Sequence, residues 1–173
     1  IMKMTQGMDE GPIYCSHEID ILGSENKNDL ETKLTYLCIK NLAADLQNIF
    51  NNKLVADEQN HSDASYCRKI DKLSGKVDFD IENTSDIIQK YKAFIGWPGL
   101  YFEKNNMQIK IHGLEEYEGS LGDLDENSFR FISNGLTVKT NNSAIVITYI
   151  QFPGKRIIPA RDAANSYAKF FQE

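Results

Sequence analysis

The chain has 173 residues, 41% of them hydrophobic, and a formal net charge of −6 at pH 7. This length and composition allow one or two ordinary globular domains. No segment approaches the roughly 18 consecutive apolar residues of a membrane-spanning helix, and no basic flank precedes an apolar core as in a signal peptide. The composition therefore argues against a membrane protein.

The first residues are predicted to form a strand, a tight turn and a second strand. The turn is Met8-Asp9-Glu10-Gly11-Pro12, where Asp and Gly are the residue types that turns favour. Taken alone, this segment is a surface turn. Alternation of Ile13, Cys15, His17 and Ile19 with polar residues then indicates a strand with one buried face. His17 is interpreted as a histidine of the core or of the sheet edge.

A long amphipathic helix is predicted next, over about 22 residues. Asn28 followed by Glu31 fits a capping box, and its apolar positions are Leu30, Leu34, Leu37, Cys38, Leu42, Leu46, Ile49 and Phe50. A helix of this kind after two strands predicts that residues 1–52 are the last piece of an open α/β domain. Residues 53–63 turn polar and lose periodicity, and residues 53–70 are predicted to be a linker.

Residues 71–173 are predicted to form a separate domain rich in strands. Thr84 or Ser85 is expected to cap a short helix that Gly96 and Pro98 end. Asn134-Gly135 predicts a type I′ hairpin turn between strands 129–132 and 136–140. Residues 144–151 are nearly all apolar or β-branched and indicate a central strand, and a terminal helix is expected over 159–171. Five or six short strands at this spacing predict a small barrel or sandwich.

Charges in the last third of the chain are separated by sign. An acidic run over 115–126 is followed by six cations and one internal acid, Asp162; the cations are Arg130, Lys139, Lys155, Arg156, Arg161 and Lys169. This asymmetry indicates a cationic surface suited to a polyanion, and the alternative is a solvated surface of mixed charge. Trp97 and Tyr101 offer rings for base stacking, but Trp97-Pro98 at a helix end is interpreted as core packing.

The three cysteines, Cys15, Cys38 and Cys67, are widely spaced. They form no CxxC pair and have no nearby pair of histidines, so the sequence predicts no metal site. Free thiols of a cytoplasmic protein are the simplest interpretation. Cys15 and Cys38 lie in apolar patterns and are expected in the core.

Several separated segments together resemble the methionyl-tRNA formyltransferase family. In chain order they are Met2-Lys3-Met4 with Gly7-Met8-Asp9-Glu10-Gly11-Pro12-Ile13-Tyr14, then 64–70 (ASYCRKI), 94–99 (FIGWPG), and 151–156 (QFPGKR) with Ala160-Arg161-Asp162. The first motif is shared by relatives that use 10-formyltetrahydrofolate. The resemblance implies that 1–52 ends a Rossmann-like catalytic domain, 53–70 is a linker, and 71–173 is an OB-fold-like open barrel with flanking helices that binds tRNA.

The resemblance also implies a reaction. This family transfers a formyl group from its co-substrate, 10-formyltetrahydrofolate, to the α-amino group of methionine on initiator tRNA. Asp9 matches the catalytic aspartate, and Gly7, Met8 and Gly11 lie with it in the folate-binding loop. A carboxylate at this place orients a histidine or water while the attacking amine loses a proton. The family's catalytic Asn and His lie upstream of residue 1, so the chain alone is expected to be inactive.

The partners follow from the same resemblance. Arg68 and Lys69 match the linker motif, where cationic side chains meet tRNA phosphates, and Lys155, Arg156 and Arg161 are the next candidates. Each of them is alternatively a solvated surface charge. The implied protein is a monomer of the bacterial cytosol, or of an organellar matrix, with no membrane partner.

Two other classes remain open. One is a different folate-dependent enzyme, a sugar N-formyltransferase or a formyl-folate hydrolase, against which the segments ASYCRKI and PGKR argue. The other is a non-catalytic nucleic-acid-binding or protein-binding barrel in which Asp9 is only a turn residue.

Overall fold

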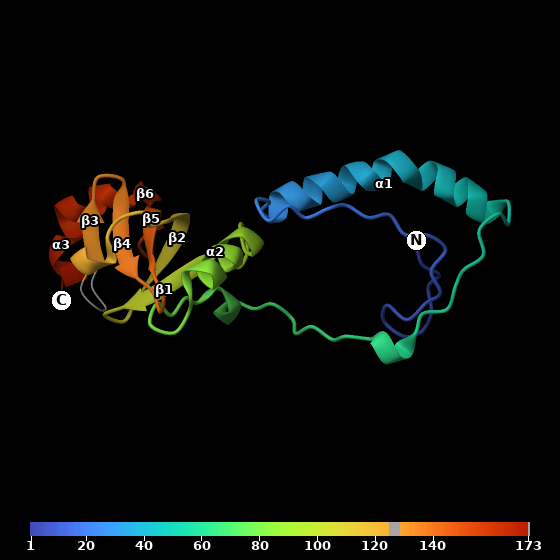
Figure 1. The fold of residues 1–173 in the computed structure, drawn as a ribbon, viewed down its shortest axis with the longest axis horizontal. Coiled ribbons are helices and arrows are strands. Elements are labelled where there is room, and N and C mark those ends of the chain that lie inside the picture. Colours follow the sequence, from blue (N-terminus) through green and yellow to red (C-terminus); the bar gives the residue numbers. More distant parts are fainter. Residues whose placement is uncertain (125–128, 173) are drawn as a thin grey trace. The chain divides into compact units, whose positions relative to one another are not determined.

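The computed structural model describes residues 1–124 and 129–172. The chain divides into two compact units, Ile1–Lys69 (unit 1) and Ile70–Glu173 (unit 2). Figure 1 shows one long helix in unit 1 and a strand-rich body with short helices in unit 2. Within the described part of the chain, no helix is both long and apolar enough to cross a membrane.

Helix α1 of unit 1 spans Lys27–Phe50, so the predicted long helix is confirmed. Its capping box lies two residues earlier than expected. The Asn26 side chain accepts from the amides of Asn28 (2.8 Å) and Asp29 (3.3 Å), and Asp29 accepts in return from the Asn26 amide at 3.0 Å. These bonds satisfy amides that a helix start otherwise leaves without partners.

The strands predicted before α1 do not form. In residues 1–52 the described backbone has only isolated bridges, Met2 with Ile13 and Ile13 with Asp57, and the alternating segment 13–19 is otherwise irregular. A strand needs a continuous neighbour for its ladder hydrogen bonds, and this segment has none in the unit. The strand prediction is therefore wrong for this structure, and the Rossmann-like remnant is not confirmed.

Most of the predicted linker lies within unit 1, which ends at Lys69. Ile13 and Asp57 exchange two backbone hydrogen bonds of 2.8 and 2.9 Å. Asn60 then caps the short 3₁₀ helix His61–Asp63 by accepting from the Ser62 amide at 3.2 Å. Residues 64–70 that follow are exposed and carry no helix or strand.

Unit 2 is built on an open antiparallel sheet of six strands among the described residues. The strands are β1 (Leu100–Lys104), β2 (Met107–Glu116), β3 (Phe129–Ile132), β4 (Gly135–Lys139), β5 (Ala144–Gln151) and β6 (Ile158–Pro159). Their order is β1-β2-β5-β4-β3, with β6 paired to β5. The predicted β-rich domain is confirmed at this level, and so is the central strand, because β5 pairs with β2, β4 and β6.

Two hairpin turns differ from the sequence prediction. Asn105 and Asn106, between β1 and β2, have φ angles of +49° and +60°, as a type I′ turn requires. In the β3–β4 hairpin Ile132 already pairs with Gly135, so Gly135 is a strand residue and the turn lies one residue earlier than predicted. A Cβ atom on Gly135 would lie 2.3 Å from the Ile147 carbonyl oxygen, so strand contact explains this glycine.

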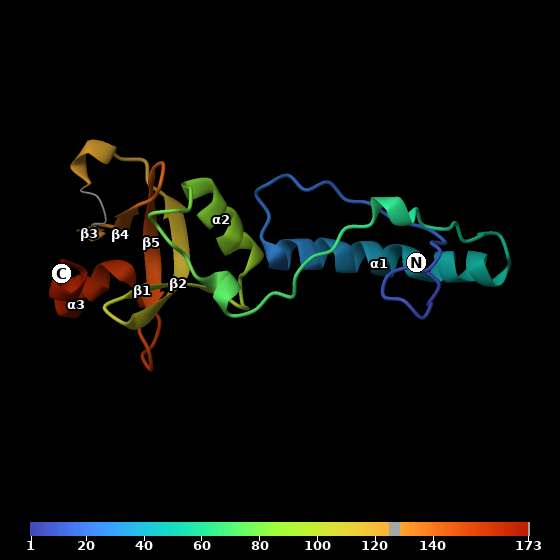
Figure 2. The same cartoon turned by 90° about the horizontal axis from the view of Figure 1, so that it is seen from below.

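Two α-helices flank the sheet on opposite sides (Figures 1 and 2). Helix α2 spans Thr84–Ala93, and its first amide donates to the Asn142 side chain at 2.9 Å rather than to its own cap residue, Asn83. The start of α2 is thus capped by the distant Asn142 and not by Thr84 or Ser85 as predicted. The expected terminal helix is present as a 3₁₀ turn, Ala160–Ala163, followed by α3, Ala164–Gln172.

An aromatic cluster brings the two edge strands of the sheet together. The ring of Phe102, on β1, stacks on that of Phe129, on β3, with centroids 5.3 Å apart, and Phe79 and Phe171 contact Phe129 as well. Phe102 is 2% exposed. The sheet therefore curls around an apolar core without its edge strands pairing in the described residues.

Candidate functional site

The Asp9 loop lies in unit 1 and is closed by backbone contacts. The Lys3 amide donates to the Pro12 carbonyl at 2.9 Å, and the Tyr14 amide donates to the Ile1 carbonyl at 2.8 Å. Gly11 is buried at this closure, where a Cβ atom would lie 1.8 Å from the Lys3 carbonyl oxygen. Only glycine fits there, which gives the Gly of the Asp-x-Gly pattern a structural reason.

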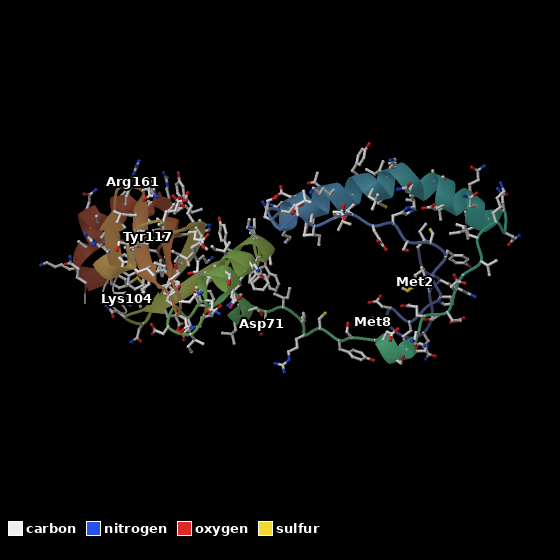
Figure 3. All side chains as sticks on the ribbon, in the orientation of Figure 1. Met2, Met8, Asp71, Lys104, Tyr117 and Arg161 are labelled. Atoms are coloured by element: carbon white, nitrogen blue, oxygen red, sulfur yellow. The ribbon has the colours of Figure 1, made fainter. Side chains whose placement is uncertain are left out.

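Asp9 has a left-handed backbone, with φ of +56°. Asp adopts this region more readily than most residues, but it is still uncommon and is found at constrained functional loops. Asp9 and Met8 are both exposed and Gly7 is half-buried, and Figure 3 labels the Met8 side chain at this loop. The loop therefore presents a carboxylate at the surface of unit 1.

Gln59 holds this loop from the segment predicted to be a linker. Its side-chain amide nitrogen lies 2.7 Å from the Gly11 carbonyl oxygen and 2.9 Å from that of Asp9, and it also approaches the Met2 sulfur at 3.5 Å. Nothing in the local sequence distinguishes Gln59 from other polar linker residues. It was missed because its partners are about 50 positions away in the chain.

The candidate tRNA residues fall into separate groups. Arg68 and Lys69 lie in the exposed stretch 64–70 at the end of unit 1. Lys155 and Arg156 are exposed in the turn after β5 in unit 2. Arg161, which Figure 3 labels, is exposed on the 3₁₀ turn and lies 3.6 Å from the Asp162 carboxylate. The sequence also predicts that the pair Arg68-Lys69 and the pair Lys155-Arg156 share one face. The two pairs belong to different units, so this remains a prediction.

The Lys155 turn is joined to polar groups of the sheet that the sequence analysis missed. Gln151 donates from its side chain to the Lys155 carbonyl at 2.9 Å, and its Oε1 lies 3.0 Å from Nε2 of His112. Lys110 pairs with Gln151 in the β2–β5 register. Lys110 and His112 are both exposed, so β2 adds polar and cationic groups beside the turn.

A small cavity of about 170 Å³ lies beside these groups, between the end of α2 and β2. Tyr91 at this cavity donates its hydroxyl to the His112 carbonyl at 2.9 Å, and burial raises the pKa of the phenol, which keeps it a donor. Trp97 is 53% exposed, so its predicted core packing is wrong. Tyr101 is only 7% exposed, which rules out its ring as a stacking platform.

The structure does not place His17 in the core or at a sheet edge, nor Cys15 and Cys38 in the core, as predicted. His17 is exposed and its Nε2 lies 2.7 Å from Oδ2 of Asp45 on α1. Cys38 is exposed and Cys15 is half-buried, and the three cysteines are free thiols. The reason for the difference is that α1 has no buried residue in the described unit, so its apolar face is not covered there.

Residues 69–168 match the protein family described as formyl transferase, C-terminal domain. The chain belongs to this family. The match covers the sheet of unit 2, the α2 helix and the Lys155 turn, and it begins at Lys69. The family assignment implied by the sequence motifs is therefore confirmed.

Relatives of this formyl transferase chain extend the match into the Asp9 loop. A methionyl-tRNA formyltransferase of Legionella pneumophila (strain Corby) is 29% identical over 166 residues, which are 96% of this chain and 52% of the relative. One from a Nitratiruptor species is 34% identical over 160 residues, 92% of this chain and 50% of the relative. The chain thus spans about half the length of the curated relatives it matches.

Solved structures support the fold. HypX from Aquifex aeolicus, in complex with tetrahydrofolic acid, aligns with 98% of this formyl transferase chain and 29% of its own, with a TM-score of 0.67 and 15% identity. WlaRD, a sugar 3N-formyltransferase crystallised with dTDP and 5-N-formyl-THF, aligns with 90% of this chain and 54% of its own, with a TM-score of 0.60 and 21% identity. At these identities the likeness concerns the fold alone.

Proposed function

We propose that this chain is the C-terminal part of a methionyl-tRNA formyltransferase, which transfers a formyl group from 10-formyltetrahydrofolate to methionine on initiator tRNA. The observation that carries the proposal is the collinear match to enzymes of that name over 96% of the chain. That match includes the Asp9 loop as well as the sheet of unit 2. The structural neighbours crystallised with folates support a folate co-substrate in the same family of folds.

In this proposal Asp9 is the catalytic carboxylate. Its exposure, and a loop fixed by Gly11 and by the Gln59 hydrogen bonds, suit a group that must meet a substrate in a defined orientation. The carboxylate orients the group that takes the proton from the attacking amine, while donors from the rest of the enzyme stabilise the oxyanion. Gly7, Met8 and Gly11 line the folate side of the loop, and Gln59 is a positioning residue.

The two units have different proposed functions, catalysis for unit 1 and tRNA binding for unit 2. Residues 1–52 are the end of a Rossmann-like catalytic domain, residues 53–70 connect the domains, and residues 71–173 form an OB-like barrel that holds tRNA. The curled open sheet of unit 2 and the exposed cations of the Lys155 turn support the last assignment. The enzyme is proposed to act as a monomer in the cytoplasm, where initiator methionyl-tRNA is its partner.

The basic turn of unit 2 is expected to contact tRNA phosphates. Replacing Lys155 and Arg156 with alanine in the full-length enzyme removes two exposed cations without touching the core. We expect tRNA affinity to fall, and the dependence of log affinity on log salt to become shallower by about one unit for each phosphate that is no longer bound. The measurement is tRNA binding at several salt concentrations.

A matched control for the basic turn is Lys40→Ala, which removes an exposed cation from α1 that is not among the candidate tRNA-binding residues. This variant is expected to keep the salt slope of the parent enzyme. An unchanged slope in the Lys155 and Arg156 variant would show that these two charges are only solvated surface groups.

A sugar N-formyltransferase is the second candidate, because WlaRD shares the fold over 90% of the chain. The two candidates differ in the amine that accepts the formyl group. The test is formyl transfer by the full-length protein from 10-formyltetrahydrofolate to methionyl-tRNA, compared with transfer to a dTDP-linked amino sugar. The proposal requires methionyl-tRNA to be the better acceptor, and preference for the amino sugar would replace it with the second candidate.

A further inference from the structure

A thiol, an imidazole and a carboxylate meet on the helix-facing side of unit 1. The atoms of Cys15, His17 and Asp45 that are able to bind a metal all lie within 4.8 Å of one another. Cys15 and His17 come from the extended segment after the Asp9 loop, and Asp45 comes from α1. Residues two apart on an extended segment point to the same side, so Cys15 and His17 both reach toward the helix.

The group lies at the rim of an apolar cavity. A cavity of about 200 Å³ is lined by His17 and Asp45 together with apolar residues, chiefly Leu34, Leu37 and Leu42. The Asp45 side chain is only 14% exposed and the His17 side chain 37%. A carboxylate that is mostly buried gains from a cationic partner, because charges interact more strongly where they are less solvated.

We propose that Cys15, His17 and Asp45 bind a single Zn²⁺ ion. Thiolate and imidazole are the ligands that zinc prefers, whereas magnesium and calcium take oxygen ligands almost exclusively. Zinc ligands in a tetrahedral site lie roughly 3.3–3.8 Å from one another, given bond lengths of about 2.0–2.3 Å. The ligand atoms lie within 4.8 Å of one another, with His17 and Asp45 only 2.7 Å apart, so the distances must change by up to about 1 Å to reach this geometry. The fourth position is left to water.

On binding, the zinc ion replaces the hydrogen bond between His17 and Asp45. Nε2 of His17 and Oδ2 of Asp45 lie 2.7 Å apart in a hydrogen bond, and the ion enters between them while the neutral imidazole keeps its proton on Nδ1. The thiol of Cys15 loses its proton to solvent as the sulfur–zinc bond forms. The result is a clamp between the segment after the Asp9 loop and α1, separate from the formyl-transfer chemistry.

The test is a titration of the full-length enzyme with Zn²⁺, and with Co²⁺ as a spectroscopic probe. We expect one ion per chain and a sulfur-to-cobalt charge-transfer band. Changing even a neighbour of a zinc ligand typically weakens zinc binding by about 10–100-fold, so losing one of the three ligands is expected to weaken it by roughly 100-fold or more. Cys15→Ser, His17→Ala and Asp45→Asn are therefore each expected to show that loss, and Cys15→Ser to lose the band.

The matched controls carry the same donor types elsewhere in unit 1. His61→Ala and Cys67→Ser remove an exposed imidazole and an exposed thiol outside the group and are expected to bind zinc as the parent does. A second measurement, the melting temperature, separates loss of zinc binding from poor folding. Zinc is expected to raise the melting temperature of the parent but not that of Asp45→Asn, which keeps the shape of the side chain. No binding, or equal binding by parent and ligand variants, would overturn the proposal and leave an ordinary His17–Asp45 ion pair.

Discussion

Asp9→Asn in the full-length enzyme is expected to lower turnover by about 100-fold or more, the usual effect of removing a group that assists proton transfer. Asparagine keeps the shape of the side chain and tolerates the left-handed backbone at φ of +56°, so the loop is expected to keep its conformation. The loss should therefore appear in kcat, with the melting temperature unchanged. On the proposed function, steady-state kinetics of methionyl-tRNA formylation measure kcat, and a thermal melt measures the melting temperature.

Glu10→Gln is the matched control for Asp9, because it neutralises the adjacent exposed acid on the same loop. Its turnover is expected to stay close to that of the parent. If Asp9→Asn also kept near-normal turnover, Asp9 would be a turn residue, as its local sequence alone indicates.

Phe102→Ala is expected to destabilise unit 2 by about 3–5 kcal/mol, the usual cost of a buried phenylalanine. Phe102 is 2% exposed and stacks on Phe129, so its removal opens a cavity where the edge strands β1 and β3 approach. Trp97 is the single tryptophan of the chain and lies in unit 2, so its fluorescence reports the unfolding of that unit. The measurement is a urea denaturation of the 173-residue chain.

The control for Phe102 is Tyr66→Ala, which removes an aromatic side chain that is 95% exposed in unit 1. The Trp97 transition is expected to be unaffected by it. A midpoint shift as small for Phe102→Ala as for this control would mean that the aromatic cluster does not hold the two edges together.

Elements whose stability is local were predictable from the sequence. The apolar spacing of α1 lies within the helix and the β-branched run of β5 lies within one strand, whereas the capping box of α1 was predicted two residues too late. The strand expected over 13–19 failed because a strand depends on its neighbours, which the local pattern does not contain. The turn predicted at Asn134-Gly135 lies one residue earlier, because register is fixed by packing of whole strands, and an unpredicted type I′ turn forms at Asn105-Asn106 in another hairpin.

The candidate site residues likewise include some with a local sequence signal and some without one. Asp9 and Gly11 were found from a short motif, and Lys155 and Arg156 from charge and resemblance. Gln59 donates hydrogen bonds to residues about 50 positions away in the sequence. Cys15, His17 and Asp45 come together from two segments about 30 residues apart. Zinc motifs are recognised by short, regular ligand spacing, so this spacing predicted no metal site.

The most direct test of the proposed function is a competition between acceptors. The full-length protein is mixed with 10-formyltetrahydrofolate, initiator methionyl-tRNA and a dTDP-linked amino sugar at equal concentrations, and mass spectrometry identifies the formylated amine. The account predicts N-formylmethionyl-tRNA as the main product, with its formation lost in the Asp9→Asn enzyme. A main product formylated on the sugar, or no formyl transfer to either amine, would contradict it.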